Sequence, residues 1–271
     1  MRLSAARCSH RGQRVRNEDY LDFCGNESIG CFALADGAGG HRGGALAAEA
    51  VVKETLSTFL ASPDVSRESA RSILTSARAA LQRARAANPD LSDMNTTLAV
   101  LLIDVRQGRA CWTQLGDTRI YLFRNGRARI LTRDHSVLQA LIDAGMKGGR
   151  EVHDSLVRNT LYASVGSDPL PPQAVCDQLL EVRQGDIFLL CTDGFWDALD
   201  ETTMESMLLE APLPEQWVER MAELIEQQSR DGQDNFSAFT VWVGERLEVT
   251  RRLPVREPQQ SGNDEGNRWN V

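Results

Sequence analysis

The sequence predicts an α+β fold in which two packed β-sheets are flanked by helices. Three observations indicate this. First, two segments with helical periodicity follow one another within residues 43–87. Second, short apolar runs separated by turn signals fill most of residues 96–193. Third, a further amphipathic segment precedes a last apolar run at residues 236–243. Helices segregated from antiparallel strands are typical of this class, and two sheets between helices would bury such apolar strands.

The first half of the chain contains one predicted strand and two predicted helices. Residues 30–35 are an apolar run typical of a buried strand. A helix follows over 43–61, because its apolar residues recur at intervals of three and four. Ser66 can cap a second helix, which ends before Asn88. The apolar face of that second helix consists of Ala70, Ile73, Ala77, Leu81 and Ala84.

Strands are expected to dominate the remainder. The clearest is a hairpin over 118–132, whose two strands are joined by Asn125-Gly126, a strong turn signal. The pattern also predicts strands at 96–105 and 109–116, a helix at 136–145, two strands on either side of Gln184-Gly185, a helix at about 214–229 and a strand at 236–243.

Composition limits the candidate functions. The 271 residues include 30 Lys and Arg against 38 Asp and Glu, a net charge of −8, which argues against nucleic acid or an anionic membrane as the main partner. The first residues lack the apolar core of a signal peptide, and no apolar stretch is long enough to span a bilayer. We therefore expect a cytoplasmic protein, with Cys31 and Cys191 as buried free thiols.

No internal repeat or change in composition marks a second domain. The prediction is one domain over 1–252 followed by a polar, disordered tail over 253–271. Within the domain, the glycine-rich segment 145–160 has the composition of an exposed insertion.

Acidic residues accompany the ends of the apolar runs. They are Asp36, Asp117, Asp193, Asp234 and the pair Glu18-Asp19. Any one of them could be an ordinary turn aspartate. If the strand ends converge, however, the carboxylates repel one another and need a cation. Clustered carboxylates suit Mg²⁺ or Mn²⁺, and Gly37 leaves its carbonyl free to approach a metal.

Seven motifs that occur in order make the interpretation more specific. They are "RVRNED", "ADGAGGH", "NTTLAV", "LGDTRIYLFRNG", "LTRDHS", "GDIFLLCTDGFWD" and "DNFSAFTV", spread over residues 10–243. In these motifs the chain resembles the metal-dependent protein phosphatases of type 2C, in their bacterial form. The resemblance implies a four-layer αββα sandwich with a metal cleft at one end and a flap subdomain at about 136–165.

The resemblance also implies a role for each acidic residue. Asp36 would bridge two metals, Asp193 and Asp234 would hold the first, and the Gly37 carbonyl and Glu18 the second. Asp117 would bind a third, weaker metal together with Asp193. Asp19 would lie next to the metal ligands without binding a metal directly, and Arg14 would bind the substrate phosphate.

The implied activity is hydrolysis of phosphoserine and phosphothreonine by a metal-bridging hydroxide at a binuclear Mn²⁺ or Mg²⁺ centre. Such an enzyme would act as a monomer and reverse a bacterial Ser/Thr kinase. Two alternatives remain: a catalytically weak pseudophosphatase that binds phosphoproteins, and a two-metal phosphodiesterase. His41 and His135 are better explained by capping and packing than by proton transfer. The sequence therefore does not identify the residue that would protonate the leaving group. Ala38 departs from the family by replacing a common methionine.

Overall fold

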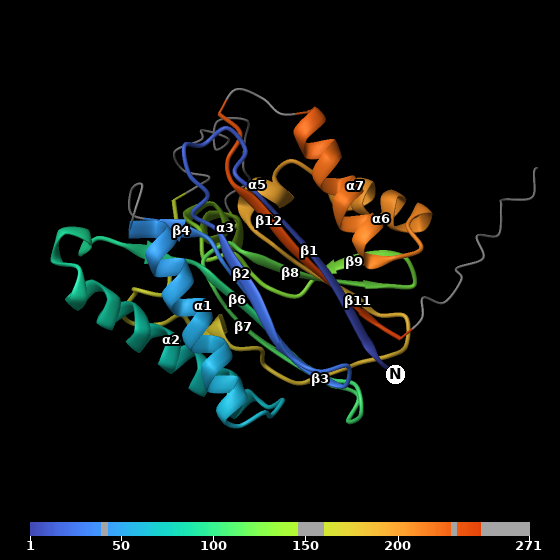
Figure 1. Ribbon diagram of the computed structural model, residues 1–271, viewed down its shortest axis with the longest axis horizontal. Helices are drawn as coiled ribbons and strands as arrows, with labels where there is room; N and C mark the ends of the chain where they lie inside the picture. The colour runs from blue at the N-terminus through green and yellow to red at the C-terminus, as the bar shows by residue number, and fades with distance from the viewer. Residues whose placement is uncertain (39–42, 146–159, 229–231, 245–271) are drawn as a thin grey trace, which may run out of the picture.

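Two five-stranded antiparallel sheets form the centre of the molecule (Figure 1). The computed structural model describes residues 1–38, 43–145, 160–228 and 232–244. The first sheet has the order β1 (Leu3–His10), β12 (Phe236–Val243), β11 (Ile187–Cys191), β8 (Arg119–Arg124) and β9 (Arg127–Ile130). The second sheet has the order β10 (Leu180–Glu181), β7 (Arg109–Leu115), β6 (Leu98–Asp104), β3 (Ile29–Ala35) and β2 (Tyr20–Gly25).

Helices cover the outer face of each sheet, as Figure 1 shows. Helices α1 (Gly43–Ala61) and α2 (Arg67–Ala87) pack on the second sheet, and α6 (Glu201–Glu210) and α7 (Pro214–Gln227) pack on the first. The predicted four-layer αββα sandwich is therefore confirmed. The smaller elements are β4 (Gly37–Ala38), which pairs with β5 (Asn95–Thr96), the short helices α3 (Val137–Asp143) and α5 (Asp193–Trp196), and the 3₁₀ turns η1 (Pro89–Leu91) and η3 (Pro172–Ala174).

The four layers enclose three apolar cores, which explains why the central strands read as continuous apolar runs. In β6, Leu98, Val100 and Leu102 face the helices, whereas the alternate residues Leu101 and Ile103 face the other sheet. Both faces of the strand are therefore buried. The helix layer over the first sheet is anchored by Trp217, which is fully buried.

Local signals account for the elements that the sequence predicts well. Asn125 and Gly126 adopt φ angles of 54° and 72°, the left-handed geometry that a two-residue hairpin turn requires. The Ser66 side chain accepts a hydrogen bond from the Ser69 N–H at 3.1 Å, so it caps α2 as expected.

The structure differs from the sequence prediction in several elements. Strands β10 and β11 do flank Gln184-Gly185, but they lie in different sheets, so the chain crosses the sandwich there. Strands β1 and β2 were not predicted, because both lie at sheet edges and are only partly buried. Helix α6 was also missed, although its Asp200 cap accepts from the Thr203 N–H.

Some predictions fall on residues outside the described ranges. They include most of the insertion at 145–160, His41 and the proposed tail at 253–271. Within the described part of the chain, none of the helices is both long and apolar enough to cross a bilayer.

Candidate metal and phosphate site

The predicted acidic residues gather at one end of the sandwich. Strand pairing shows why: Leu34 lies opposite Ala99 and Leu98 opposite Leu115, so the segments bearing Asp36 and Asp117 leave the second sheet at the same edge. In the first sheet, Cys191 lies opposite both Arg119 and Ala238. Asp193 follows β11 and Asp234 precedes β12, so these two residues meet at that end as well.

A pocket of about 510 Å³ opens at this end. Six of its lining residues are predicted metal ligands and one is the predicted phosphate-binding arginine. The predicted residues in its lining are Arg14, Glu18, Asp36, Gly37, Asp117, Asp193 and Asp234, accompanied by Gln13, Val15, Arg16, Ala38, Thr97, Leu161 and Asn235. The convergence that the sequence could only suggest is therefore present.

Two threonines fix Asp36 at the end of β3. The Asp36 N–H donates to Thr97 Oγ1 at 2.9 Å, and the Thr97 N–H donates to the Asp36 carbonyl at 2.8 Å. Thr96 Oγ1 donates to the same carbonyl at 2.7 Å. These bonds hold the backbone of Asp36 in place at the pocket that this residue lines.

Glycines let the neighbouring segments approach closely. A Cβ atom on Gly37 would collide with the Gly44 carbonyl, and a Cβ on Gly44 would collide with Glu18 Oε2. The Gly37 N–H donates to the Glu18 carbonyl at 3.2 Å. The start of α1, β4 and Glu18 thus form one tight unit that only glycine permits.

Asn235 joins the N-terminal loop to the first sheet. Its Oδ1 accepts from the Glu18 N–H at 2.8 Å, and its Nδ2 donates to the carbonyls of Arg11 and Arg16 at 2.8 and 2.9 Å. The loop between these residues carries Arg14. Asn235 therefore positions Glu18 and Arg14 together, a role that its place in the "DNFS" motif did not reveal.

Asp19 is not in the lining of this pocket but is joined to a segment that is. Its Oδ2 accepts from Thr192 Oγ1 at 3.1 Å, next to Asp193 in the chain. Asp19 Oδ1 and Asp193 Oδ1 are buried and have no hydrogen-bond partner among the described residues. Unpaired buried carboxylate oxygens are costly, so these atoms indicate that a cation or ordered water belongs beside them.

A stacked group supports Asp117. The Trp196 Nε1–H donates to the Asp117 carbonyl at 3.0 Å, and the Arg119 guanidinium lies 3.5 Å from the centre of the Trp196 ring. Arg119 in turn forms a two-pronged ion pair with Asp134, with an Nη2–Oδ2 distance of 2.7 Å. The sequence indicated neither Trp196 nor Arg119 as part of the site.

The electrostatics of the cluster favour protonation or a bound cation. Burial, reinforced by the charges of Asp19 and Asp193, raises the pKa of Asp36 well above its ordinary value. Burial and then the charge of Asp193 raise the pKa of Asp117 to about 8. Burial and then Asp234 raise the pKa of Asp193. Each carboxyl thus resists ionisation without positive charge nearby.

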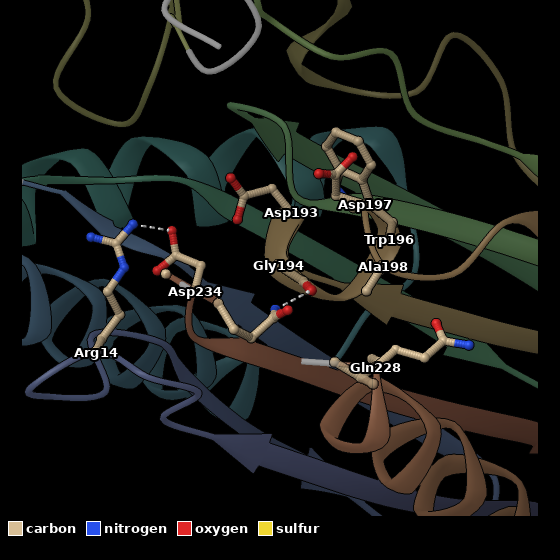
Figure 2. A pocket seen from close by; sticks show the side chains of 11 residues that line it. Arg14, Asp193, Gly194, Trp196, Asp197, Ala198, Gln228 and Asp234 are labelled. Atoms are coloured by element: carbon tan, nitrogen blue, oxygen red, sulfur yellow. Dashed lines mark hydrogen bonds and ion pairs between the residues drawn. The ribbon is translucent and has the colours of Figure 1, made fainter. Parts of the chain in front are cut away.

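Arg14 supplies positive charge to one member of the cluster. Its Nη2 lies 2.7 Å from Asp234 Oδ2, and Figure 2 shows the two side chains facing each other. Across the described ranges, no group of three His, Cys, Asp or Glu side chains is arranged to hold a metal as it stands.

The residues nonetheless fit a pair of hard divalent cations. Mg²⁺ binds through one or two carboxylates and retains several waters, so an all-protein cage is not required. The pocket offers five carboxylates, the backbone of Gly37 and the unpartnered Oδ1 of Asp193. The Arg14–Asp234 pair is 57% and 39% exposed at its side chains, so opening it costs little.

Metal-free protein should lose stability as the pH rises. A carboxyl whose pKa is raised on folding stabilises the folded state while it is protonated, and that contribution is lost as the pH passes the folded-state pKa. For Asp117 and Asp19 the pKa values are about 8 and about 7. We expect the Tm in chelator to fall by several degrees between pH 6 and pH 8.5, as measured by differential scanning fluorimetry.

Two controls accompany this measurement. Asp117→Asn removes one of the titrating groups, so its Tm should depend less steeply on pH. Added Mn²⁺ should raise the Tm more at pH 8.5 than at pH 6, because it replaces the protons. A Tm in chelator that stays constant or rises over this interval would contradict the electrostatic picture.

The structure supports a packing role for His135. Its Nδ1 accepts from the Gly116 N–H at 3.2 Å, and its ring packs edge-on against Tyr162 at 5.7 Å. Burial lowers its pKa to about 4, so the imidazole is neutral near pH 7. His135 is absent from the pocket lining, as expected from the sequence.

The arrangement defines a class: a β-sandwich between helix layers, with a carboxylate cleft and an arginine at one end. A family model described as protein phosphatase 2C matches residues 8–235. The chain belongs to the protein phosphatase 2C family, which confirms the resemblance seen in its motifs.

Individual proteins show the same similarity. The chain is 30% identical over 269 residues to the serine/threonine protein phosphatase PstP of Mycobacterium tuberculosis, covering 96% of this chain and 48% of PstP. It therefore spans about half the length of this relative. A crystal structure of M. tuberculosis PstP superposes with a TM-score of 0.77 at 28% identity, over 90% of this chain and all of that one.

A second PstP structure is described as the catalytic domain in complex with two manganese ions. It has a TM-score of 0.75 and 28% identity, and it covers 90% of this chain and 99% of that chain. A relative with this overall fold thus holds two metal ions.

Proposed function

We propose that this chain is a metal-dependent phosphatase that acts on phosphoserine and phosphothreonine in proteins. The observation that carries the proposal is the convergence of Glu18 and four aspartates with Arg14 in one cleft. The names of the related phosphatases and the two manganese ions of one relative support it.

The proposed ligands follow the sequence prediction. Asp36 would contact both cations, Asp193 and Asp234 would hold one, and the Gly37 carbonyl and Glu18 would hold the other. Asp117, with Asp193, would contribute a third and weaker site. Two divalent cations would supply a water of lowered pKa and neutralise charge on the phosphoryl oxygens. Either Mn²⁺ or Mg²⁺ suits this set of oxygen donors.

The chain's own residues supply orientation. Arg14 lies at the edge of the carboxylate cleft, where its guanidinium can leave Asp234 and bind two phosphate oxygens. Asn235 holds the Arg14 loop against Glu18, which fixes the distance between the phosphate-binding and metal-binding groups. Thr96 and Thr97 keep Asp36 in place during turnover.

Turnover should depend on added divalent metal. We expect hydrolysis of p-nitrophenyl phosphate with Mn²⁺, loss of at least about 100-fold in chelator, and recovery when Mn²⁺ is restored. Phosphoserine and phosphothreonine peptides should be hydrolysed, and phosphotyrosine peptides much more slowly.

The same assay separates the two alternatives. A pseudophosphatase would bind phosphopeptides without turning over any of these substrates. A phosphodiesterase would prefer bis-p-nitrophenyl phosphate to the monoester, which would contradict the proposal.

The cellular setting is also part of the proposal. We place the chain in the cytoplasm as a monomer, opposite a Ser/Thr kinase whose products it dephosphorylates. The six free cysteines support a reducing compartment, and the phosphatase names of the relatives support phosphorylated proteins as partners.

A further inference from the structure

Two cysteine side chains that the phosphatase site does not use lie in direct contact. Cys111 Sγ on β7 is 2.9 Å from Cys176 Sγ, although the residues are 65 positions apart in the sequence. Both are buried, with 0% and 5% of their surface exposed. Neither lines the metal pocket. All six cysteines are free thiols in the structure.

The backbone around the pair holds the two sulfur atoms together. The segment before β10 runs alongside β7: Thr113 and Val175 form an antiparallel bridge, and the Cys176 N–H donates to the Trp112 carbonyl at 3.0 Å. Arg67 Nε on α2 donates to the Cys176 carbonyl at 3.0 Å. The contact is therefore fixed by three separate elements, so it does not depend on side-chain rotamers alone.

The two thiols differ in chemical character. The hydrogen bond from Cys111, aided by the Trp112 backbone and Arg67, lowers the pKa of Cys176 to about 7 against the opposing effect of burial. The bond to Cys176 and burial raise the pKa of Cys111 well above its ordinary value. The thiolate is the reactive form of cysteine, so the lower pKa of Cys176 makes it the better nucleophile of the two.

We propose that Cys111 and Cys176 form an oxidation site, at which a peroxide converts the two thiols into a reversible intramolecular disulfide. The sulfur atoms must approach from 2.9 Å to about 2.05 Å, a shift that side-chain rotation can supply. Only Cys176 keeps any exposed surface, 5% against 0% for Cys111, so a peroxide would meet Cys176 first.

The chemistry balances with hydrogen peroxide as the oxidant. The Cys176 thiolate attacks one peroxide oxygen; an S–O bond forms, the O–O bond breaks, and the departing hydroxide takes a proton to become water. Cys111 then attacks the Cys176 sulfur of the sulfenic acid; the S–S bond forms, the S–O bond breaks, and the Cys111 proton leaves in a second water. Two thiols and one peroxide thus give one disulfide and two waters.

The disulfide would join β7 to the segment before β10. It would close a loop that contains β8, β9, α3 and the carboxylate of Asp117. Closing a long loop restricts the unfolded chain and so stabilises the folded one. We expect the Tm to rise by about 5–10 °C on oxidation and to return on reduction.

The test uses the full chain with Mg²⁺, first reduced and then freed of reductant. After treatment with one to five equivalents of hydrogen peroxide, remaining thiols are blocked by alkylation and peptides are mapped without reduction. The expected result is a dominant Cys111–Cys176 linked peptide that dithiothreitol removes. In Cys111→Ala, the linked peptide and the rise in Tm should both be absent.

The chain offers matched controls. Cys8→Ala removes a partly buried thiol elsewhere in the fold, so the linked peptide and the Tm rise should persist. Cys24 and Cys31 lie opposite each other on β2 and β3 and are the competing pair. A linked Cys24–Cys31 peptide with Cys111 and Cys176 still open to alkylation on unfolding would overturn the proposal. The absence of any linked peptide from the oxidised wild-type protein would also overturn the proposal, and this result does not depend on whether a variant folds.

Discussion

Replacing Asp193 by asparagine is expected to lower kcat/KM for p-nitrophenyl phosphate by about 10³-fold or more at low Mn²⁺. Asp193 is the first residue of α5, and its unpartnered Oδ1 lies in the carboxylate cluster. Asparagine keeps the shape but removes the charge that a metal requires, and metal stabilisation of the transition state is worth several kcal/mol. The measurement is turnover as a function of Mn²⁺ concentration.

Two further observations make this experiment decisive. The Mn²⁺ concentration that gives half-maximal activity should rise in Asp193→Asn, whereas the Tm in chelator should not fall, because one of the repelling carboxylates is gone. The matched control is Asp177→Asn, an exposed aspartate outside the pocket, which should behave as wild type. Near wild-type turnover of Asp193→Asn at low Mn²⁺ would remove Asp193 from the metal site.

Much of the fold could be predicted because the relevant signals are local. Asn125-Gly126 sets a hairpin by its own backbone geometry, and Ser66 caps its helix through a residue three positions away. The apolar runs predicted buried strands correctly. The sheet to which each strand belongs could not be predicted, as β10 and β11 show, since that choice depends on packing between distant segments.

In the candidate site, too, some residues could be predicted from local sequence signals and others could not. Its carboxylates could be proposed from their positions at the ends of apolar runs. The residues that position them are Asn235, Trp196 and Arg119. Asn235 and Trp196 form hydrogen bonds to residues 224 and 79 positions away, and Arg119 stacks on the Trp196 ring. Such contacts leave no periodic trace in a sequence. The pairing of Arg14 with Asp234 across 220 positions is of the same kind.

Replacing Arg14 by alanine should lower kcat/KM for phosphomonoesters by about 10²-fold without weakening the response to metal. One preorganised donor to a developing oxyanion is worth about 10²–10³-fold in rate. Arg14 pairs with Asp234 rather than filling a core position, and its side chain is 57% exposed. Its loss should therefore leave the Tm within about 2 °C of wild type, because exposed ion pairs contribute little.

The distinguishing feature is the metal dependence. Removing Arg14 frees the Asp234 carboxylate, so the Mn²⁺ concentration for half-maximal activity should stay the same or fall, opposite to Asp193→Asn. Arg14→Lys should recover only part of the rate, since an ammonium cannot bind two phosphate oxygens in a planar fork. Arg7→Ala serves as the control, because Arg7 pairs with Asp22 on β2 outside this pocket. If Arg14→Ala kept full kcat/KM, or lost activity only through a higher Mn²⁺ requirement, Arg14 would be a partner of the metal ligands and not the phosphate-binding residue.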